Sequence, residues 1–436
     1  MTRNTIIGAC SIIVLFCGLA SCNENSPTTT ISAATDGVFT LVVIPDTQNA
    51  IDYTRQIAEG FAIDSVEIFL EQMEHIANRS IENGGDVAFV ASLGDVWQHV
   101  TLDMDPAHRV RGFTAVETSG GPVSAMLKPE PALNFEIPRA IEGYQLISDA
   151  GIPFGVAPGN HDYDAWWLVP NESSGPEGLQ NNINIHVGGL DNFRMAFGND
   201  TEFFLNKDWY VDDYNGGGSS AQVFSAAGYQ FLHFAFEMQA GDAVVDWAQD
   251  VIDRHPGLPT LISTHDYLNP RGERLPSDRM NLALADPEGN NSAEELWQEF
   301  IRENDQIFMV LSGHQIGQSI RVDLNDDNHQ VFQILSDYQG RGQAGIDAGQ
   351  PLNEDGAITG IGDGWFREMV FHLGDESPRI DIKTFSSHYD LYSSQLESYA
   401  SWYKNQEQPD MSDSEFLDAD EYTISLDDFY QRFGRP

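Results

Sequence analysis

The stretch FTLVVIPDTQ, Phe39 to Gln48, decides the fold class of this chain of 436 residues. Its first part, Phe39 to Pro45, is a continuous apolar run rich in β-branched residues, which predicts a strand buried on both faces. The strand ends by delivering the carboxylate of Asp46. Strands buried on both faces belong mainly to parallel sheets covered by helices, so we expect a helix to follow.

A helix and a second strand follow in the predicted order. Apolar residues recur at helical spacing between Ser65 and Asn83, and Gly84-Gly85 ends the pattern. Val87 to Leu93 is then a second buried apolar run, which ends on Gly94-Asp95. The order of strand, helix and strand predicts a βαβ unit and therefore an α/β protein.

The alternation of helix and strand repeats three more times. Helices are predicted over Arg139 to Asp149, Ala243 to Asp253 and Ser292 to Arg302, and strands over Pro153 to Ala157, Leu258 to Ser263 and Ile307 to Leu311. Each strand is followed by a polar motif: Gly159-Asn160-His161-Asp162, Thr264-His265 or Gly313-His314. Ligands of open α/β sheets bind beyond the carboxyl ends of the strands, so we expect these side chains to gather round a cation. This predicts a metal-assisted hydrolase.

We predict a single domain over residues 38–436 with two irregular insertions, residues 101–138 and 166–218. These insertions are long for connections in a domain, which indicates functional lids or surface decoration. A hairpin is predicted over Val223 to Glu237 with Gly228 at its turn. After His314 the pattern changes to short strands, which we interpret as an antiparallel part that completes a second sheet.

The N-terminus has the pattern of a targeting segment. Residues 1–21 combine Arg3, an apolar core and a small-residue region before Cys22, and residues 22–37 are typical of a flexible tether. The segment resembles a bacterial lipoprotein signal peptide, which implies export, acylation of Cys22 and lipid anchoring on a membrane, periplasmic or at the cell surface. An ordinary secretory signal is the alternative. All three cysteines lie here, so a disulfide within the folded domain is excluded.

The charge of the chain limits its partners. A formal net charge of -45, from 67 acidic and 22 basic residues, repels polyanions, so extended nucleic acid is not expected as a partner. Two interpretations of the acidic excess are accumulation of cations and adaptation of the surface to salty surroundings, and we favour the second.

The motifs, in this order, resemble the calcineurin-like metallophosphoesterase superfamily, and the resemblance spans Phe39 to Phe385. It implies a two-layer αββα sandwich with mixed central sheets and two metal ions, at which a metal-activated water attacks a phosphate mono- or diester. The residues that it assigns are Asp95 as the bridging ligand, Asn160, His265 and His314 at the second metal, and His161 as the general acid. The protein would then be a phosphatase or phosphodiesterase.

Three positions depart from the superfamily pattern. Gln48 stands in place of a histidine, Gln98 in place of an aspartate and Ile316 in place of a second histidine. The first metal site is thereby reduced to Asp46, Asp95 and the amide of Gln48. Gln98 removes the carboxylate that would usually orient the acid His161, so Asp162 beside it is predicted as the second catalytic residue.

The departures themselves resemble a bacterial and fungal branch of the superfamily. That branch opens with Pro-Asp-Thr-Gln, which here is Pro45-Asp46-Thr47-Gln48. Two downstream segments match it as well, Tyr338-Gln339-Gly340 and Gly364-Trp365-Phe366-Arg367. Gln48 is therefore interpreted as part of the branch's design.

The types of donor atom indicate which metals fit. Carboxylate, amide and imidazole groups favour Mn, Fe or Zn, so one or two such divalent ions are the predicted cofactors. The alternative interpretations are aspartates that cap the turns after strands and histidines that are satisfied within the core.

Two arginines are the candidate substrate-binding residues. Arg341 and Arg367 are candidates for contact with phosphate, because guanidinium binds phosphate in two places; salt bridges to the abundant carboxylates are the alternative. We predict a small phosphorylated substrate. The alternative function is a metal-retaining surface lipoprotein that binds phosphorylated ligands without turnover.

Overall fold

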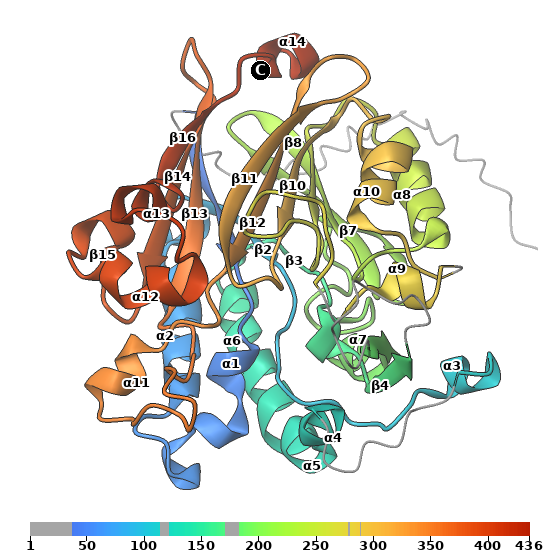
Figure 1. Ribbon diagram of the computed structural model, residues 1–436. Helices are drawn as coiled ribbons and strands as arrows, with labels where there is room; N and C mark the ends of the chain where they lie inside the picture. The colour runs from blue at the N-terminus through green and yellow to red at the C-terminus, as the bar shows by residue number, and fades with distance from the viewer. Residues whose placement is uncertain (1–36, 114–121, 171–182, 278–279, 288) are drawn as a thin grey trace, which may run out of the picture. The chain divides into compact units, whose positions relative to one another are not determined.

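Strand β1 (Val38–Ile44), built from the opening stretch, lies within a mixed sheet in the computed structural model (Figure 1). The structure describes residues 37–113, 122–170, 183–277, 280–287 and 289–436. The predicted signal peptide, Cys22 and nearly all of the predicted tether lie outside these residues. Every described residue belongs to one compact unit, Ala33–Pro436.

The first sheet has the strand order β15-β14-β13-β1-β2-β3, and β16 also pairs with β14. Its further strands are β2 (Val87–Ser92), β3 (Phe154–Val156), β13 (Trp365–His372), β14 (Arg379–Ser386), β15 (Leu391–Tyr392) and β16 (Tyr422–Ser425). Strands β1, β2 and β3 are parallel, as the βαβ prediction requires, whereas β13 is antiparallel to β1. The carboxyl ends of β1, β2 and β3 therefore lie at one edge.

The second sheet has the strand order β11-β12-β10-β9-β8-β7-β6. Its strands are β6 (Tyr210–Tyr214), β7 (Ser219–Ala226), β8 (Tyr229–Ala235), β9 (Thr260–Ser263), β10 (Ile307–Ser312), β11 (Gly317–Leu324) and β12 (Gln330–Asp337). Strands β8, β9, β10 and β12 are parallel. The predicted hairpin is β7 and β8, and its turn, Ala227-Gly228, has two positive φ angles of 49° and 83°.

Alternating side chains of β1 explain how the layers pack. Phe39, Leu41 and Val43 belong to a core between the two sheets, together with residues of β8, β9 and β10. Val42 and Ile44 point to the opposite face, where they join helices α2 (Ser65–Asn78) and α6 (Ile137–Asp149). Helices α8 (Asp242–Arg254) and α10 (Ala293–Leu296) cover the outer face of the second sheet (Figure 1). The protein is thus a mixed α/β structure.

Several boundaries differ from the predictions for local reasons. The helix predicted to end at Asn83 ends at Asn78, because the Ser80 side chain accepts a hydrogen bond from the backbone of Asn83 and starts a separate turn, Ile81–Asn83. The helix predicted over Ser292 to Arg302 begins as α10, capped by Ser292, and continues as a wider π-helical turn, Trp297–Ile301.

The C-terminal strands do not all complete the second sheet, and that prediction was wrong in part. Strands β11 and β12 join the second sheet, but β13, β14, β15 and β16 return to the first. The reason is the long antiparallel pairing of β13 with β1, which runs from Val38 opposite His372 to Val43 opposite Arg367.

The two insertions were expected to be irregular, but the structure gives both of them secondary structure. The first contains α3 (Pro106–Val110), α4 (Pro122–Met126), α5 (Pro129–Pro131) and the turn Ala132–Glu136, and the second contains β4 (Ala165–Pro170), β5 (Ile183–Gly188), α7 (Asp191–Phe197) and β6. Phe193 and Phe197 of α7 are buried in the core beside α6, which fixes the second insertion on the domain.

The remaining helices are short or lie near the C-terminus. They are α1 (Gln48–Ile51), α9 (Leu282–Ala285), α11 (Gln343–Asp347), α12 (Tyr399–Glu407), α13 (Asp413–Asp418) and α14 (Phe429–Phe433), with single turns at Tyr53–Arg55, Ile57–Glu59, Asn160–Asp162 and Ser393–Gln395. Within the described ranges, no helix has the length and apolar composition needed to cross a membrane.

Candidate metal centre

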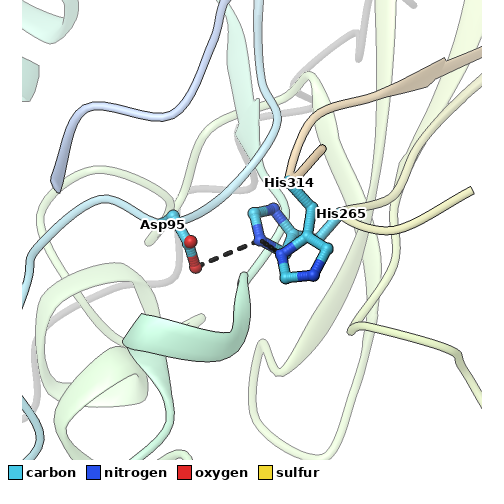
Figure 2. Close-up of side chains that lie close together, drawn as sticks. All are labelled: Asp95, His265 and His314. Atoms are coloured by element: carbon cyan, nitrogen blue, oxygen red, sulfur yellow. Dashed lines mark hydrogen bonds and ion pairs between the residues drawn. The ribbon is translucent and has the colours of Figure 1, made fainter. Parts of the chain in front are cut away.

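His265 is at the centre of the candidate site, where the carboxyl ends of strands from both sheets meet. Its side chain is buried, and its Nδ1–H donates to the carbonyl oxygen of Leu93 at 2.8 Å. In the neutral ring Nε2 therefore carries the lone pair. This atom lies 3.1 Å from Asp95 Oδ1, 3.0 Å from Asn160 Oδ1 and 3.1 Å from His314 Nδ1. Figure 2 shows the two imidazoles and the Asp95 carboxylate turned towards one another.

These four atoms have the geometry and chemistry of a metal site. Ligands held about 2.0–2.2 Å from one cation lie roughly 3 Å or slightly more from each other, which is the spacing round His265 Nε2. A carboxylate, an amide oxygen and two imidazoles suit Mn, Fe or Zn. The group of Asp95, His265 and His314 can therefore hold a metal ion.

The backbone at this edge is strained in ways that the site requires. Asp95 and His314 have positive φ angles of 51° and 68°, which are uncommon for residues other than glycine and concentrate at functional sites. Gly159 and Gly313 are needed because a Cβ at either position would collide with the carboxylate of Asp95 or Asp46, respectively. The motif glycines thus allow the ligand loops to approach each other closely.

Asp46 lies beside this group at the end of β1. Its carboxylate accepts the backbone N–H of His314 at 3.1 and 3.2 Å and the side-chain amide of Gln339 at 3.0 Å. The same Gln339 amide also donates to Asp337 Oδ2 at 2.9 Å. Asp337 ends β12, so the second sheet contributes an acidic side chain of its own to this edge.

Gln48 connects the two groups of ligands. Its Nε2 donates to Asp95 Oδ2 at 3.1 Å and to Gln339 Oε1 at 2.7 Å, while its Oε1 is buried and has no hydrogen-bond partner within the part of the chain that the structure describes. A buried amide oxygen without a partner is costly. Rotating this amide would place the oxygen beside Asp95 Oδ2, and a cation bound between the two oxygens would stabilise that arrangement. The orphaned oxygen therefore fits a metal at the first site.

The charges at the site also favour a cation. Asp46, Asp95 and Asp337 are all buried, and among the described residues none of them forms an ion pair with an arginine or lysine. Burial and nearby carboxylates raise the pKa of Asp46, and burial raises that of Asp337 to about 7. Burial opposes the charge of His265 too, but Asp95 and Asp46 outweigh it and raise the pKa of His265 to about 10. Protonation would add a proton at Nε2, the ring atom that faces Asp95, Asn160 and His314 and that would bind a metal.

His161 approaches the same space from the turn after β3. Its Nδ1–H donates to the carbonyl oxygen of Gln98 at 2.6 Å, and its Nε2 lies 3.8 Å from Asp95 Oδ2. Trp166 packs edge-on against the ring at 4.7 Å between centroids. Burial lowers the pKa of His161 even though Asp95 acts to raise it. The backbone carbonyl of Gln98 thus does the orienting that was expected of the Asp162 carboxylate.

The predicted catalytic role of Asp162 does not agree with its position. Its Oδ1 accepts the backbone N–H of Val96 at 2.8 Å, its Oδ2 accepts that of Gly159 at 2.8 Å, and the side chain is fully buried. Both carboxylate oxygens are occupied by the loops after β2 and β3. Asp162 therefore positions the ligand loops and does not face the reacting space.

Arg341 and Arg367 are not placed to contact phosphate, and that prediction was wrong. Both side chains have no exposed surface. Arg341 pairs with Glu407 at 2.8 Å, and Arg367 pairs with Asp420 at 2.9 Å. The abundance of carboxylates explains the result, because each guanidinium is used within the structure to neutralise buried acids.

The structure brings together seven of the predicted site residues: Asp46, Gln48, Asp95, Asn160, His161, His265 and His314. Three residues at the site were missed as site residues. The Gln339 side-chain amide donates to both Asp46 and Asp337, and Ser277 Oγ lies 3.1 Å from His314 Nε2. Asp337 carried the same signal as Asp46 and Asp95, an aspartate at the end of an apolar strand; Ser277 carried none.

No family model matches the chain. A protein of Bacillus subtilis (strain 168), described as "Uncharacterized protein YvnB", is 25% identical over 255 residues, which cover 57% of this chain and 16% of the relative. The chain thus spans well under two thirds of the relative that it matches.

Proposed function

We propose that this protein is a metal-dependent phosphoesterase of the calcineurin-like type that hydrolyses small phosphate mono- or diesters. The observation that carries the proposal is the convergence of Asp95, Asn160 and His314 on Nε2 of His265 within 3.1 Å. Bound divalent ions would supply Lewis acidity, which lowers the pKa of water and holds phosphoryl oxygens. Asp46 and the amide of Gln48 are the proposed ligands of the first ion.

The αββα sandwich of that superfamily is part of the proposal. It is supported by the order of the layers, in which α2 and α6, the two sheets, and α8 and α10 follow one another. It is also supported by the ligands themselves, which come from the carboxyl ends of β1, β2 and β3 in one sheet and β9 and β10 in the other.

His161 is the proposed general acid. With Nδ1–H committed to the Gln98 carbonyl, Nε2 is the ring atom that can hold a proton towards the leaving oxygen of an ester. The packing of Trp166 against the ring restricts its rotation and limits access of water. The chain itself therefore fixes where the proton is presented.

Export and lipid anchoring through acylated Cys22 complete the proposal, on the basis of the N-terminal sequence. The acidic surface supports a small phosphorylated substrate in place of extended nucleic acid. Membrane attachment can be tested by labelling with a radioactive or alkynyl fatty acid, which the Cys22→Ser variant should fail to incorporate.

The function is tested with purified protein, p-nitrophenyl phosphate and its bis ester, and a series of Mn²⁺, Fe²⁺ and Zn²⁺. We expect Asn160→Ala to lose both bound metal and activity, since it removes a ligand. His161→Gln should keep its metal but hydrolyse the ester about 10²–10⁴-fold more slowly, because only proton transfer is removed. His388→Gln, at an exposed position, serves as the control and should match wild type.

Metal content, measured by elemental analysis, separates the two effects. Wild-type protein that hydrolyses neither ester with any metal would contradict the proposal. Tight binding of phosphate by such inactive protein, measured by calorimetry, would instead support the alternative of a lipoprotein that captures phosphorylated ligands.

A further inference from the structure

A second group of metal-type ligands lies where the two insertions meet the segment after α9, and it shares no residue with the candidate metal centre. His108 is in α3, His186 is in β5 and Asp286 follows α9. The Nε2 atoms of both histidines lie 3.9 Å from Asp286 Oδ2, and the ligand atoms of all three residues lie within 4.8 Å of one another. Three segments far apart in the sequence therefore meet at one point.

His186 presents a buried lone pair to this point. Its Nδ1–H donates to the carbonyl oxygen of Val187 at 2.8 Å, so Nε2 is the acceptor nitrogen of the neutral ring. Only 1% of His186 is exposed, and its Nε2 has no hydrogen-bond partner among the described residues. A lone pair facing a carboxylate is unfavourable unless a positive charge lies between them.

Asp105 holds His108 in a position typical of a metal ligand. One oxygen of Asp105 caps α3 by accepting the backbone N–H groups of Ala107 and His108 at 2.9 and 3.1 Å. The other oxygen lies 2.5 Å from His108 Nδ1. A carboxylate on one ring nitrogen fixes the tautomer and leaves the other nitrogen free to bind metal. This arrangement leaves His108 Nε2 directed towards Asp286.

Asp286 also has one oxygen to spare. Its Oδ1 accepts a hydrogen bond from Arg111 at 2.5 Å, whereas Oδ2 is the atom nearest both imidazoles. A cavity of about 480 Å³ is lined by Asp105, His108, His186 and Asp286. It gives an ion a route from solvent and leaves space for a further ligand.

We infer that His108, His186 and Asp286 bind a divalent transition-metal ion and that Asp105 orients His108. Zn²⁺ is the ion used to test this inference. Two histidines and one carboxylate with an open position form a common set for Zn²⁺ or Fe²⁺. Two ligand atoms that each lie about 2.0–2.1 Å from one zinc ion are roughly 3.4 Å apart. The distances from the two Nε2 atoms to Asp286 Oδ2 are 3.9 Å and therefore need to shorten by about 0.5 Å.

The ion would join the insertions to each other and to the main domain. Strand β4 links the two sites, since its neighbouring side chains Trp166 and Trp167 contact different histidines. Trp166 packs against His161, and Trp167 stacks on His186 at 4.7 Å between centroids. Neighbouring residues of a strand point to opposite faces, so β4 carries one contact to each site.

Zinc stoichiometry tests the inference. Wild type, His186→Gln, His265→Gln and the double variant are loaded with Zn²⁺, desalted and analysed for metal. We expect His186→Gln to retain about one zinc ion per chain fewer than wild type, and the double variant to retain fewer than either single variant. The matched control is His329→Gln, whose side chain also pairs with an aspartate, Asp305 at 2.6 Å, and which should retain as much zinc as wild type.

Equal zinc in wild type and folded His186→Gln would overturn the inference. If His186→Gln does not fold, Co²⁺ titrated into His265→Gln gives the answer without it. A visible Co²⁺ absorption band that Zn²⁺ abolishes, and that a further His108→Gln substitution removes, supports a second site, whereas no band, or a band that His108→Gln leaves unchanged, refutes it. Because His265→Gln removes a ligand of the main centre, this result does not depend on whether the protein is a phosphoesterase.

Discussion

His233 and His265 show how neighbours decide the charge of a buried histidine. They lie on or after adjacent strands of the second sheet, and both are buried. His233 contacts neutral groups, with Nδ1 2.7 Å from Gln222 Oε1 and Nε2 2.8 Å from Ser263 Oγ, so burial lowers its pKa to about 3. His265 faces carboxylates, which outweigh burial and raise its pKa.

The pKa of His233 predicts part of the acid sensitivity of the protein. In the unfolded chain His233 binds a proton below the usual histidine pKa of 6.5, whereas in the folded protein it stays neutral down to about pH 3. The free energy of unfolding therefore decreases as the pH falls from 6.5 to about 3. Lowering the pH from 7 to 4 should, through this histidine, decrease the free energy of unfolding by about 3 kcal/mol. We expect His233→Gln to lose correspondingly less stability over that range.

Urea unfolding at the two pH values measures the difference. His388→Gln, a change at an exposed histidine, is the control and should lose as much stability as wild type. An unchanged loss of stability in His233→Gln would show that the buried ring takes up its proton without unfolding.

At the scale of elements, a buried ionic cluster fastens the C-terminal segment to both sheets. Arg341 follows β12 of the second sheet, Arg367 lies in β13 of the first, and both contact Asp420, which precedes β16. Asp420 also accepts hydrogen bonds from Tyr338 at 2.9 Å and Tyr399 at 2.5 Å. The arginines that suggested a phosphate site therefore have a structural role.

Removing the charge of Asp420 should destabilise the protein strongly. We expect Asp420→Asn to lower the free energy of unfolding by about 3–5 kcal/mol, because Arg367 is left buried without its acidic partner. Asp375→Asn breaks an ion pair with Arg379 near the surface and should cost less than about 1 kcal/mol. Denaturant unfolding of both variants measures the contrast, and similar losses in the two would contradict the role of the cluster.

At the scale of the whole molecule, acidic residues far outnumber basic ones. The sequence carries a formal charge of -45, and many of its few arginines are committed to internal or local ion pairs. Like charges on a surface repel one another and oppose the compact state. The same excess of negative charge surrounds a site whose ligands are themselves acidic.

Salt should therefore stabilise the folded protein. Raising NaCl from about 0.1 M to about 1 M shortens the Debye length from about 10 Å to about 3 Å and screens the repulsion, so we expect the melting temperature to rise by several degrees. Calorimetry with a chelator present removes any effect of divalent ions. Choline chloride at equal ionic strength should produce a similar rise, and an unchanged or lower melting temperature in both salts would contradict the prediction.

The sequence by itself determined the α/β class, the order of the strands and helices up to β10, and the polar side chains that follow β1, β2, β3, β9 and β10. These features are local, because they follow from apolar runs, helical spacing and the motif glycines. The parallel direction of the strands placed Asp46, Asp95 and Asn160 at one edge of the first sheet and His265 and His314 at one edge of the second, and the packing of the two sheets brought these edges together.

Only the tertiary structure decided which polar groups meet. It placed Arg341 and Arg367 in the interior, turned Asp162 towards backbone amides, and brought His108 and His186 to Asp286. Nothing local in the sequence separates an arginine that binds phosphate from one that pairs with a distant acid. The partner of a buried charge is set by long-range packing, because the free energy of that charge depends on every group that replaces water round it.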